Sequence, residues 1–329
     1  MTEKKTRLAV IILLALLFLT ALAGIVFGSV RLTFSELLSG ISGDNKTARI
    51  IIADLRLPRV CAAILAGIGL SSAGLLLQTV TDNKLCAPNI IGINSGAGLA
   101  VMLLTCFFPL LWEFLPIAAF AGALLTAFTV LGVSGIGGTK GRKSSVILAG
   151  VAVSSMMSSG ISFLSLKFPD ALPSYVGFSV GGFSGVKMKE LIIPAVIIAF
   201  SFLISFLLAP KIRLLILGDD AASTLGINVR AVRMAAIVLA SALAASVVSF
   251  AGLIGFVGLI VPHIARKISG GGLRMTLIVS ALCGGVLVTV SDLVGRALFP
   301  PGEIPAGIFM AFLGAPFFLW LLIRGRHSL

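Results

Sequence analysis

The sequence predicts an all-α polytopic membrane protein with about ten transmembrane helices. Long apolar segments recur along the chain, 58% of its residues are hydrophobic, and the mean hydropathy is +1.15. A hydrocarbon core of about 30 Å needs roughly 20 apolar residues per helical crossing. The longest polar region, residues 31–59, is interrupted by isoleucines and is too short for a soluble domain. Residues 1–329 are therefore predicted to form a single transmembrane domain.

Eight segments have the length of one crossing and carry no Asp, Glu, Lys or Arg. The first of them follows Lys4, Lys5 and Arg7, as the apolar region of a cleaved signal peptide would. Its length of about 20 residues favours an uncleaved first span instead. The eight predicted segments are Leu8–Gly28, Val60–Val80, Ile90–Leu111, Leu115–Ile136, Val146–Leu166, Leu191–Ala209, Met275–Ser291 and Ile304–Ile323.

One further stretch, Met234–Ala265, contains no charged residue and is too long for a single crossing. Its second half holds Gly252, Gly255, Gly258 and Pro262. We expect a full helix to about Phe250, a glycine-rich turn, and a short helix that returns through Pro262-His263. These two crossings bring the predicted total to ten.

Basic residues at both ends of the chain place both termini in the cytoplasm by the positive-inside rule. Lys4, Lys5 and Arg7 precede the first span, and Arg324 and Arg326 follow the last. Two cytoplasmic termini require an even number of crossings, which agrees with ten. The net charge of +13 is explained by basic residues at span ends, so nucleic-acid binding is not expected.

Similar segments open the second and the seventh predicted spans. Residues 57–63 and 232–236 each contain an arginine that is followed within three positions by the first of a pair of alanines, and each span leads to a glycine-rich break. The two spans run in opposite directions across the membrane in this topology. The pattern is a weak indication of the inverted repeat that many transporters contain.

Arg56-Leu57-Pro58-Arg59 stands at the start of the second span. One interpretation is a charged cap for a helix that has Pro in its first turn. The alternative is a pair of exposed arginines that bind an acidic partner. Arg296, near the same end of the ninth span, lies four residues after Asp292, so the two can form an ion pair across one helical turn.

Three polar residues lie in or near the connection between the second and third spans: Gln78, Asn89 and Asn94. Polar side chains are costly in lipid. We expect them to face protein or a water-filled path, and we expect the same of Asp292.

The segment between the sixth and seventh spans predicts a short cytoplasmic helix. Acidic residues stand where its N-terminus would be, and Gly226 would end it. A solvated loop is the alternative to a helix that contacts a soluble partner. In such a contact we expect the apolar Ala221, Ala222 and Leu225 to fill a groove of the partner. The residues concerned are Gly218, Asp219, Asp220, Ala221, Ala222, Ser223, Thr224, Leu225 and Gly226.

The chain shows no catalytic, metal or cofactor pattern. Cys61, Cys86, Cys106 and Cys283 are scattered without a C-x-x-C pair, which favours buried apolar residues over a disulfide or a metal site. His263 follows Pro262 without acidic neighbours, so a structural role is favoured over a proton carrier. His327 lies at the tail. A membrane-embedded enzyme is therefore not expected.

An energy source is also missing from the sequence. No Gly-Lys dipeptide occurs, so there is no phosphate-binding loop, and residues 137–142 are interpreted as a basic cytoplasmic turn. Apart from Asp292, acids within the spans are essentially absent, which argues against a proton-coupled carrier built on carboxylate relays. An ion-coupled secondary transporter, which would work without an ATPase partner, is the alternative from another class. A partner must supply the energy for any transport.

The order of these motifs resembles the permease subunits of iron-siderophore, haem and cobalamin ABC importers, the FecCD-type family, over nearly the whole chain. The matching residues are Arg56–Arg59, Ser72-Ala73-Gly74, Gln78, Leu85, Ala87-Pro88, Gly92, Gly96-Ala97, Leu148-Ala149-Gly150, Leu217-Gly218-Asp219, Ala222, Leu225-Gly226, Gly258–Arg266, Asp292, Arg296, Glu303-Ile304-Pro305, Gly307 and Gly314-Ala315-Pro316.

The resemblance implies the ten-span fold of a type II ABC importer permease in the cytoplasmic membrane. It implies two copies of the chain around a central path, two separate ATPase subunits and an extracytoplasmic binding protein. Arg56, Arg59 and Arg296 would dock the binding protein, and the segment Gly218–Gly226 would couple to an ATPase. The expected cargo is a ferric siderophore, with haem or cobalamin as alternatives, and no cofactor or enzymatic activity is expected in this subunit.

Overall fold

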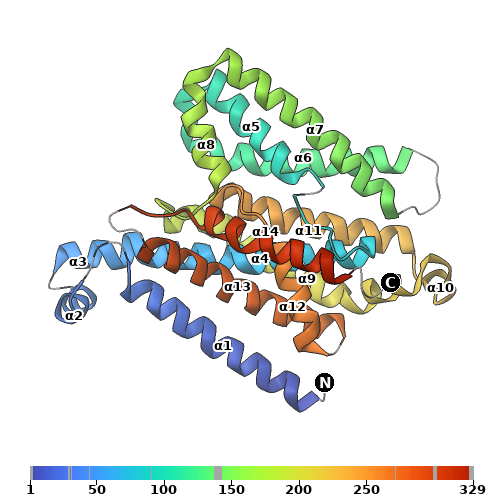
Figure 1. Cartoon of the computed structure of the whole chain (residues 1–329), viewed down its shortest axis with the longest axis horizontal. Helices are drawn as coiled ribbons and strands as arrows, with labels where there is room; N and C mark the ends of the chain where they lie inside the picture. Colours follow the sequence, from blue (N-terminus) through green and yellow to red (C-terminus); the bar gives the residue numbers. More distant parts are fainter. Residues whose placement is uncertain are drawn as a thin grey trace.

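The computed structural model is a bundle of long helices that describes residues 3–28, 30, 32–43, 45–89, 91–136, 143–270, 272–298 and 302–325 (Figure 1). The predicted turn at 137–142, Arg31, Arg326 and His327 lie outside the described residues. The long helices are α1 (Glu3–Val26), α4 (Leu57–Thr81), α5 (Ile93–Phe107), α6 (Leu115–Ile136), α7 (Lys143–Lys167), α9 (Met188–Leu214), α11 (Val229–Ala251), α12 (Val257–Ser269), α13 (Leu273–Leu298) and α14 (Ala306–Gly325).

These helices agree with the predicted spans. Seven helical segments of the described residues are long and apolar enough to cross a membrane, and α5 and most of α14 are shorter apolar helices. The charge-free stretch divides as predicted, because α11 ends at Ala251 and α12 begins at Val257. With α12 counted, the described helices account for the ten predicted crossings.

Several short helices were not predicted from the sequence. The longest polar region, residues 31–59, contains α2 (Phe34–Ser42), α3 (Lys46–Ile50) and the π-helical turn η1 (Ile51–Arg56). A further short helix, α8 (Leu172–Val180), precedes α9. Short 3-10 turns η2 (Pro109–Phe114), η3 (Pro169–Ala171) and η4 (Leu215–Leu217) join longer helices.

Helix α4 lies at the centre of the bundle because its small residues allow close packing. A β-carbon at Gly67 would lie 2.1 Å from the carbonyl oxygen of Gly284 in α13. One at Gly74 would lie 2.0 Å from the carbonyl oxygen of Gly258 in α12. In lipid, where the hydrophobic effect does not drive helices together, such close backbone approach supplies much of the packing energy.

The predicted inverted repeat stays a prediction, but its two opening helices have a clear relationship in space. Helices α4 and α11 pack against each other and run in opposite directions along the bundle (Figure 1).

Three breaks in the helices meet at one place in the bundle. The Gly182 amide donates to the Ala251 carbonyl (2.8 Å), and the Leu253 amide donates to the Phe178 carbonyl (3.1 Å). The Gly307 amide, at the start of α14, donates to the Gly181 carbonyl (3.1 Å). Non-helical backbone is tolerated within a membrane only when its polar groups are satisfied by protein or water. These bonds supply the partners.

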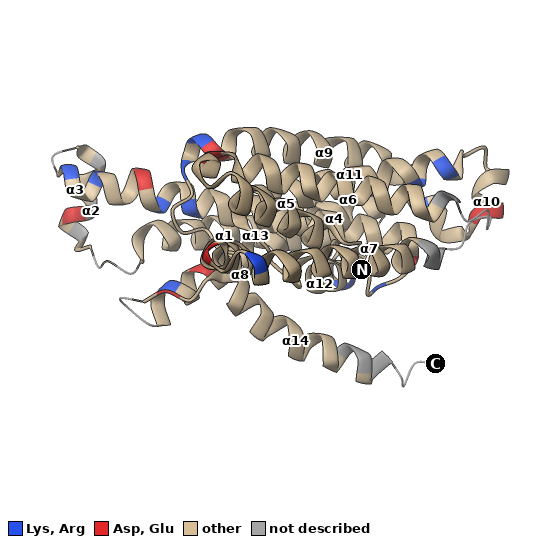
Figure 2. Ribbon diagram, turned by 90° about the horizontal axis from the view of Figure 1, so that it is seen from above, with Lys and Arg blue, Asp and Glu red and all other residues tan. Residues whose placement is uncertain are grey.

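Most charged residues lie toward the two ends of the bundle (Figure 2). One end, called here the Arg56 end, carries α2, α3, the start of α4 and the start of α9. The opposite end, called the α10 end, carries the short helix α10 (Asp219–Thr224) and the start of α11 (Figure 1).

Candidate functional site

A largely buried ion cluster at the Arg56 end ties α4, α13 and the segment before α14 together. Arg59 of α4 donates from Nη2 to Asp292 Oδ1 of α13 at 2.9 Å and from Nη1 to Glu303 Oε2 at 2.6 Å. Arg296 Nε lies 3.1 Å from Asp292 Oδ2, which confirms the pair predicted from their spacing. Asp292 is 1% exposed, and two guanidiniums compensate its negative charge within the span.

Arg56 performs a different task from Arg59. Its Nη1 donates to the carbonyls of Ile25 and Val26, at 2.7 Å each, and its Nη2 donates to the carbonyl of Val30. The last carbonyls of a helix have no intrahelical donor and carry partial negative charge. Arg56 therefore caps the end of α1.

The prediction that Arg56 and Arg59 are exposed is wrong for the isolated chain. They are 4% and 9% exposed, and Arg296 is 2% exposed. The cause is that groups within the chain contact them. Helix-end carbonyls hold Arg56, and Asp292 and Glu303 hold Arg59. Arg296 is ion-paired with Asp292 and donates from Nη1 to the Gly24 carbonyl, although its Nη2 has no hydrogen-bond partner among the described residues. The alternative, that Arg59 caps its own helix, is also not observed, since no side chain caps α4.

The three arginines nevertheless line a cleft of about 760 Å³ at this end. Lys187 and Lys189, at the start of α9, line the same cleft and are exposed. Asp54 and Glu303 are its acidic lining residues. The cleft is therefore predominantly cationic.

The α10 end carries the predicted short helix. Asp219 and Asp220 occupy its first turn, and the Gly226 amide donates to the Ser223 carbonyl just after its end. Asp219 Oδ1 lies 2.6 Å from Arg233 Nη2, which ties α10 to the start of α11. This ion pair was not predicted.

The residues of the predicted coupling segment differ in exposure. Ala222 is fully buried in its own chain, so the expectation that it fills a groove of a partner is wrong. Leu225 is 59% exposed, and Ile216 and Leu217 of η4 are 51% and 61% exposed. The sequence does not predict the exposure of Ile216, because that exposure depends on where η4 ends. All three are large apolar side chains exposed at the α10 end.

The three polar residues of the second connection are placed differently. Gln78 is 3% exposed; its Nε2 donates to the Gly258 carbonyl (3.0 Å), and its Oε1 accepts from Arg266 Nη1 (2.7 Å). Gln78 thus joins α4 to α12. Asn94 is partly buried, whereas Asn89 is exposed in the isolated chain.

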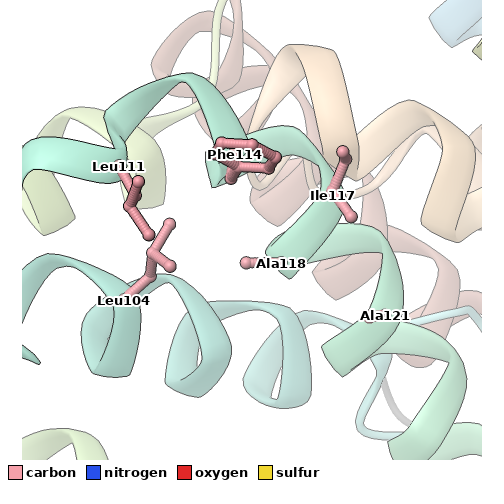
Figure 3. Close-up of a pocket in the computed structure, with 6 residues that line it drawn as sticks. All are labelled: Leu104, Leu111, Phe114, Ile117, Ala118 and Ala121. Atoms are coloured by element: carbon pink, nitrogen blue, oxygen red, sulfur yellow. The ribbon is translucent and has the colours of Figure 1, made fainter. Parts of the chain in front are cut away.

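Two other features carry no polar chemistry. A crevice of about 380 Å³ between α5 and the start of α6 is lined only by apolar side chains (Figure 3): Leu104, Leu111, Phe114, Ile117, Ala118 and Ala121. His263 packs edge-on against Phe317, with ring centroids 6.0 Å apart. Within the described residues, no cluster of three His, Cys, Asp or Glu side chains could hold a metal ion.

A bundle of long apolar helices, closely packed through glycines and interrupted by satisfied backbone breaks, is the architecture of a membrane transport protein. The chain belongs to the FecCD transport family, which matches residues 13–324.

Relatives match over nearly their whole length. The Fe(3+)-citrate import system permease protein YfmE of Bacillus subtilis (strain 168) is 37% identical, covering 97% of this chain and 96% of the relative. The probable heme-iron transport system permease protein IsdF of Staphylococcus aureus (strain MSSA476) is 32% identical, covering 100% of this chain and 99% of the relative.

The fold is also similar to a solved structure. A metal-chelate type ABC transporter in an inward-facing conformation superposes with a TM-score of 0.84 and 29% sequence identity, covering 96% of this chain and 98% of the other.

Proposed function

We propose that the chain is the membrane-spanning permease subunit of an ATP-driven ABC importer that takes up a ferric siderophore. The observation that carries this proposal is the match to the FecCD transport family over residues 13–324. The names of the relatives add the cargo class, since they include import permeases for ferric citrate, achromobactin and siderophores. A heme-iron permease among them supports haem as an alternative cargo, and cobalamin is the other alternative.

The energy would come from two separate ATPase subunits bound at the α10 end. The absence of a phosphate-binding loop in the sequence supports a separate energy source. The exposed Ile216, Leu217 and Leu225 offer an apolar surface for a partner at this end. On this proposal the α10 end and both termini face the cytoplasm, and the Arg56 end faces outward from the cytoplasmic membrane.

A second copy of the chain would complete the central path. Helices α7 and α14 both present large apolar side chains that the isolated chain leaves exposed, such as Met156 (71%) and Phe312 (77%). Either lipid or a second copy could cover such surfaces, and two-fold pairing is the usual form of a self-association interface.

An extracytoplasmic binding protein would dock at the Arg56 end. The cationic cleft there supports an acidic partner, and Arg56, Arg59 and Arg296 would form the rigid floor of the docking surface. Arginine forms planar bidentate pairs with carboxylates, so a partner carboxylate that reached the floor would find suitable donors.

The test is transport by the reconstituted complex. Proteoliposomes that hold the permease, its ATPase and the binding protein should accumulate a ferric siderophore only when ATP is present on the α10 side. Ferric citrate, haem and cobalamin, supplied with their own binding proteins, distinguish the cargo alternatives. Uptake driven by an ion gradient in the absence of any ATPase would contradict the proposal and favour a secondary transporter.

A further inference from the structure

We infer that Lys187 and Lys189, rather than the three buried arginines, provide the exposed positive charge that first contacts the acidic surface of the binding protein. This inference rests on the proposed function. It adds two residues that the motif resemblance does not indicate. The exposed lysines would make the first contact with the partner, and the buried arginines would form the floor of the cleft.

The first step is that the arginines are not available for an encounter. Arg56 is held by the carbonyls at the end of α1, and Arg59 and Arg296 are held by Asp292. Two of the three have a guanidinium nitrogen within 3.1 Å of a carboxylate oxygen. A partner that approaches from water therefore meets arginines that already have contacts: Arg59 and Arg296 with Asp292, and Arg56 with backbone carbonyls.

The second step is the position of the two lysines. Both are exposed and line the cleft. Among the described residues neither forms an ion pair, so their charges are uncompensated at short range. An exposed, mobile ammonium can pair with a carboxylate of a partner without breaking an existing contact.

The third step is that these lysines are poorly placed for helix stability. Lys187 is the N-cap of α9, and Lys189 lies in its first turn. The positive end of the helix dipole disfavours cations there. Glu190 offsets part of this cost, because its Oε2 accepts a hydrogen bond from the Lys187 amide at 3.2 Å. Residues that disfavour the local structure, as these lysines do at a helix N-terminus, often mark a functional site.

The fourth step is the charge of the whole cleft. Five cationic and two acidic side chains line it, so the local field favours an anionic surface. Charges of this kind raise the association rate by steering the encounter, and salt screens them over about 8 Å at physiological ionic strength.

The test compares two double charge reversals of equal size. K187E/K189E alters the cleft, whereas K46E/R49E alters exposed cations of α3 at the same end that do not line it. The permease is placed in lipid nanodiscs, and the association rate of the binding protein that supports its uptake is measured at low and high salt. We expect K187E/K189E to reduce the association rate about tenfold or more at low salt, with convergence at high salt.

The control and the neutral variant make the result decisive. K46E/R49E should change the rate by far less, and K187Q/K189Q should fall between wild type and K187E/K189E. A wild-type association rate for K187E/K189E, or an equal loss in both reversals, would overturn the inference. If K187E/K189E does not fold, K187Q/K189Q carries the same test. Failure of the wild-type complex to transport with ATP would instead contradict the proposed function.

Discussion

Arg59 donates to both carboxylate oxygens of Asp292, from Nε at 3.0 and 3.1 Å and from Nη2 at 2.9 Å, across 233 positions of the sequence. With Arg296 on the other side of the same carboxylate, this contact fixes the start of α4 against the end of α13.

Asp292→Asn should strongly destabilise the protein, because it leaves the buried Arg296 without its carboxylate and leaves Arg59 with Glu303 alone. Breaking a buried pair by removing one partner typically costs about 3–5 kcal/mol. The measurement is thermal unfolding in detergent. Glu303→Gln is the matched control: its side chain is 25% exposed, so water can compensate and the loss should be much smaller. Equal losses in the two variants would contradict this account.

Gly67→Ala should destabilise the packing of α4 on α13. The added β-carbon would lie 2.1 Å from the Gly284 carbonyl oxygen, so the backbones must separate. Overpacking of this kind costs about 1–3 kcal/mol. Gly132→Ala on α6 is the control, since no atom lies within 4 Å of the corresponding position. The two variants are compared by their unfolding midpoints, and an unchanged midpoint for Gly67→Ala would contradict the close packing.

Leu225→Asp should uncouple ATP hydrolysis from transport in the reconstituted complex. Leu225 is 59% exposed at the α10 end, so the change should leave the fold of the permease intact while it removes an apolar contact to the ATPase. The ratio of cargo moved to ATP hydrolysed is the quantity to measure, and we expect it to fall several-fold. Thr224→Asp, which adds the same charge at an exposed neighbour, is the control. A wild-type ratio for Leu225→Asp would contradict the proposal that Leu225 belongs to the coupling surface.

The short helix α2 should lose its N-terminal cap in acid. Hydrogen bonds from the Thr33 backbone amide and from its hydroxyl lower the pKa of Glu36 below its ordinary value. A lowered pKa in the folded state means that the stabilisation is fully present above the unfolded pKa and is lost as pH falls through the folded pKa. Protection factors of the α2 amides should fall in that range. Glu36→Gln should remove most of the pH dependence; if it does not, another group is responsible.

The sequence was sufficient for features that depend on local pattern. The length of the charge-free stretch and its glycines located the break between α11 and α12, and the i,i+4 spacing located the Asp292–Arg296 pair. The missed helix α2 also had a readable signal, since Thr33 and Glu36 form a capping box.

Features that depend on distant backbone could not be predicted in this way. Arg56 is buried because its guanidinium donates to carbonyls of α1, some 30 positions earlier in the sequence. Every residue has a backbone carbonyl, so residue types do not indicate which carbonyl will accept these hydrogen bonds. Glu303 meets Arg59 only once α13 and α14 are in place. The same limit explains why Ala222 was expected to be exposed and is buried instead.

The attachment of α1 has a consequence for the order in which the protein is assembled. At one end Thr6 Oγ1 donates to the Ser269 carbonyl at 2.9 Å, and at the other Arg56 and Arg296 hold its last carbonyls. Between these points the helix is largely unburied by the rest of the chain. Residues 269–296 follow α1 and Arg56 by more than 200 positions, so α1 can make only its Arg56 contacts until those residues are synthesised, and both of its ends are held only afterwards.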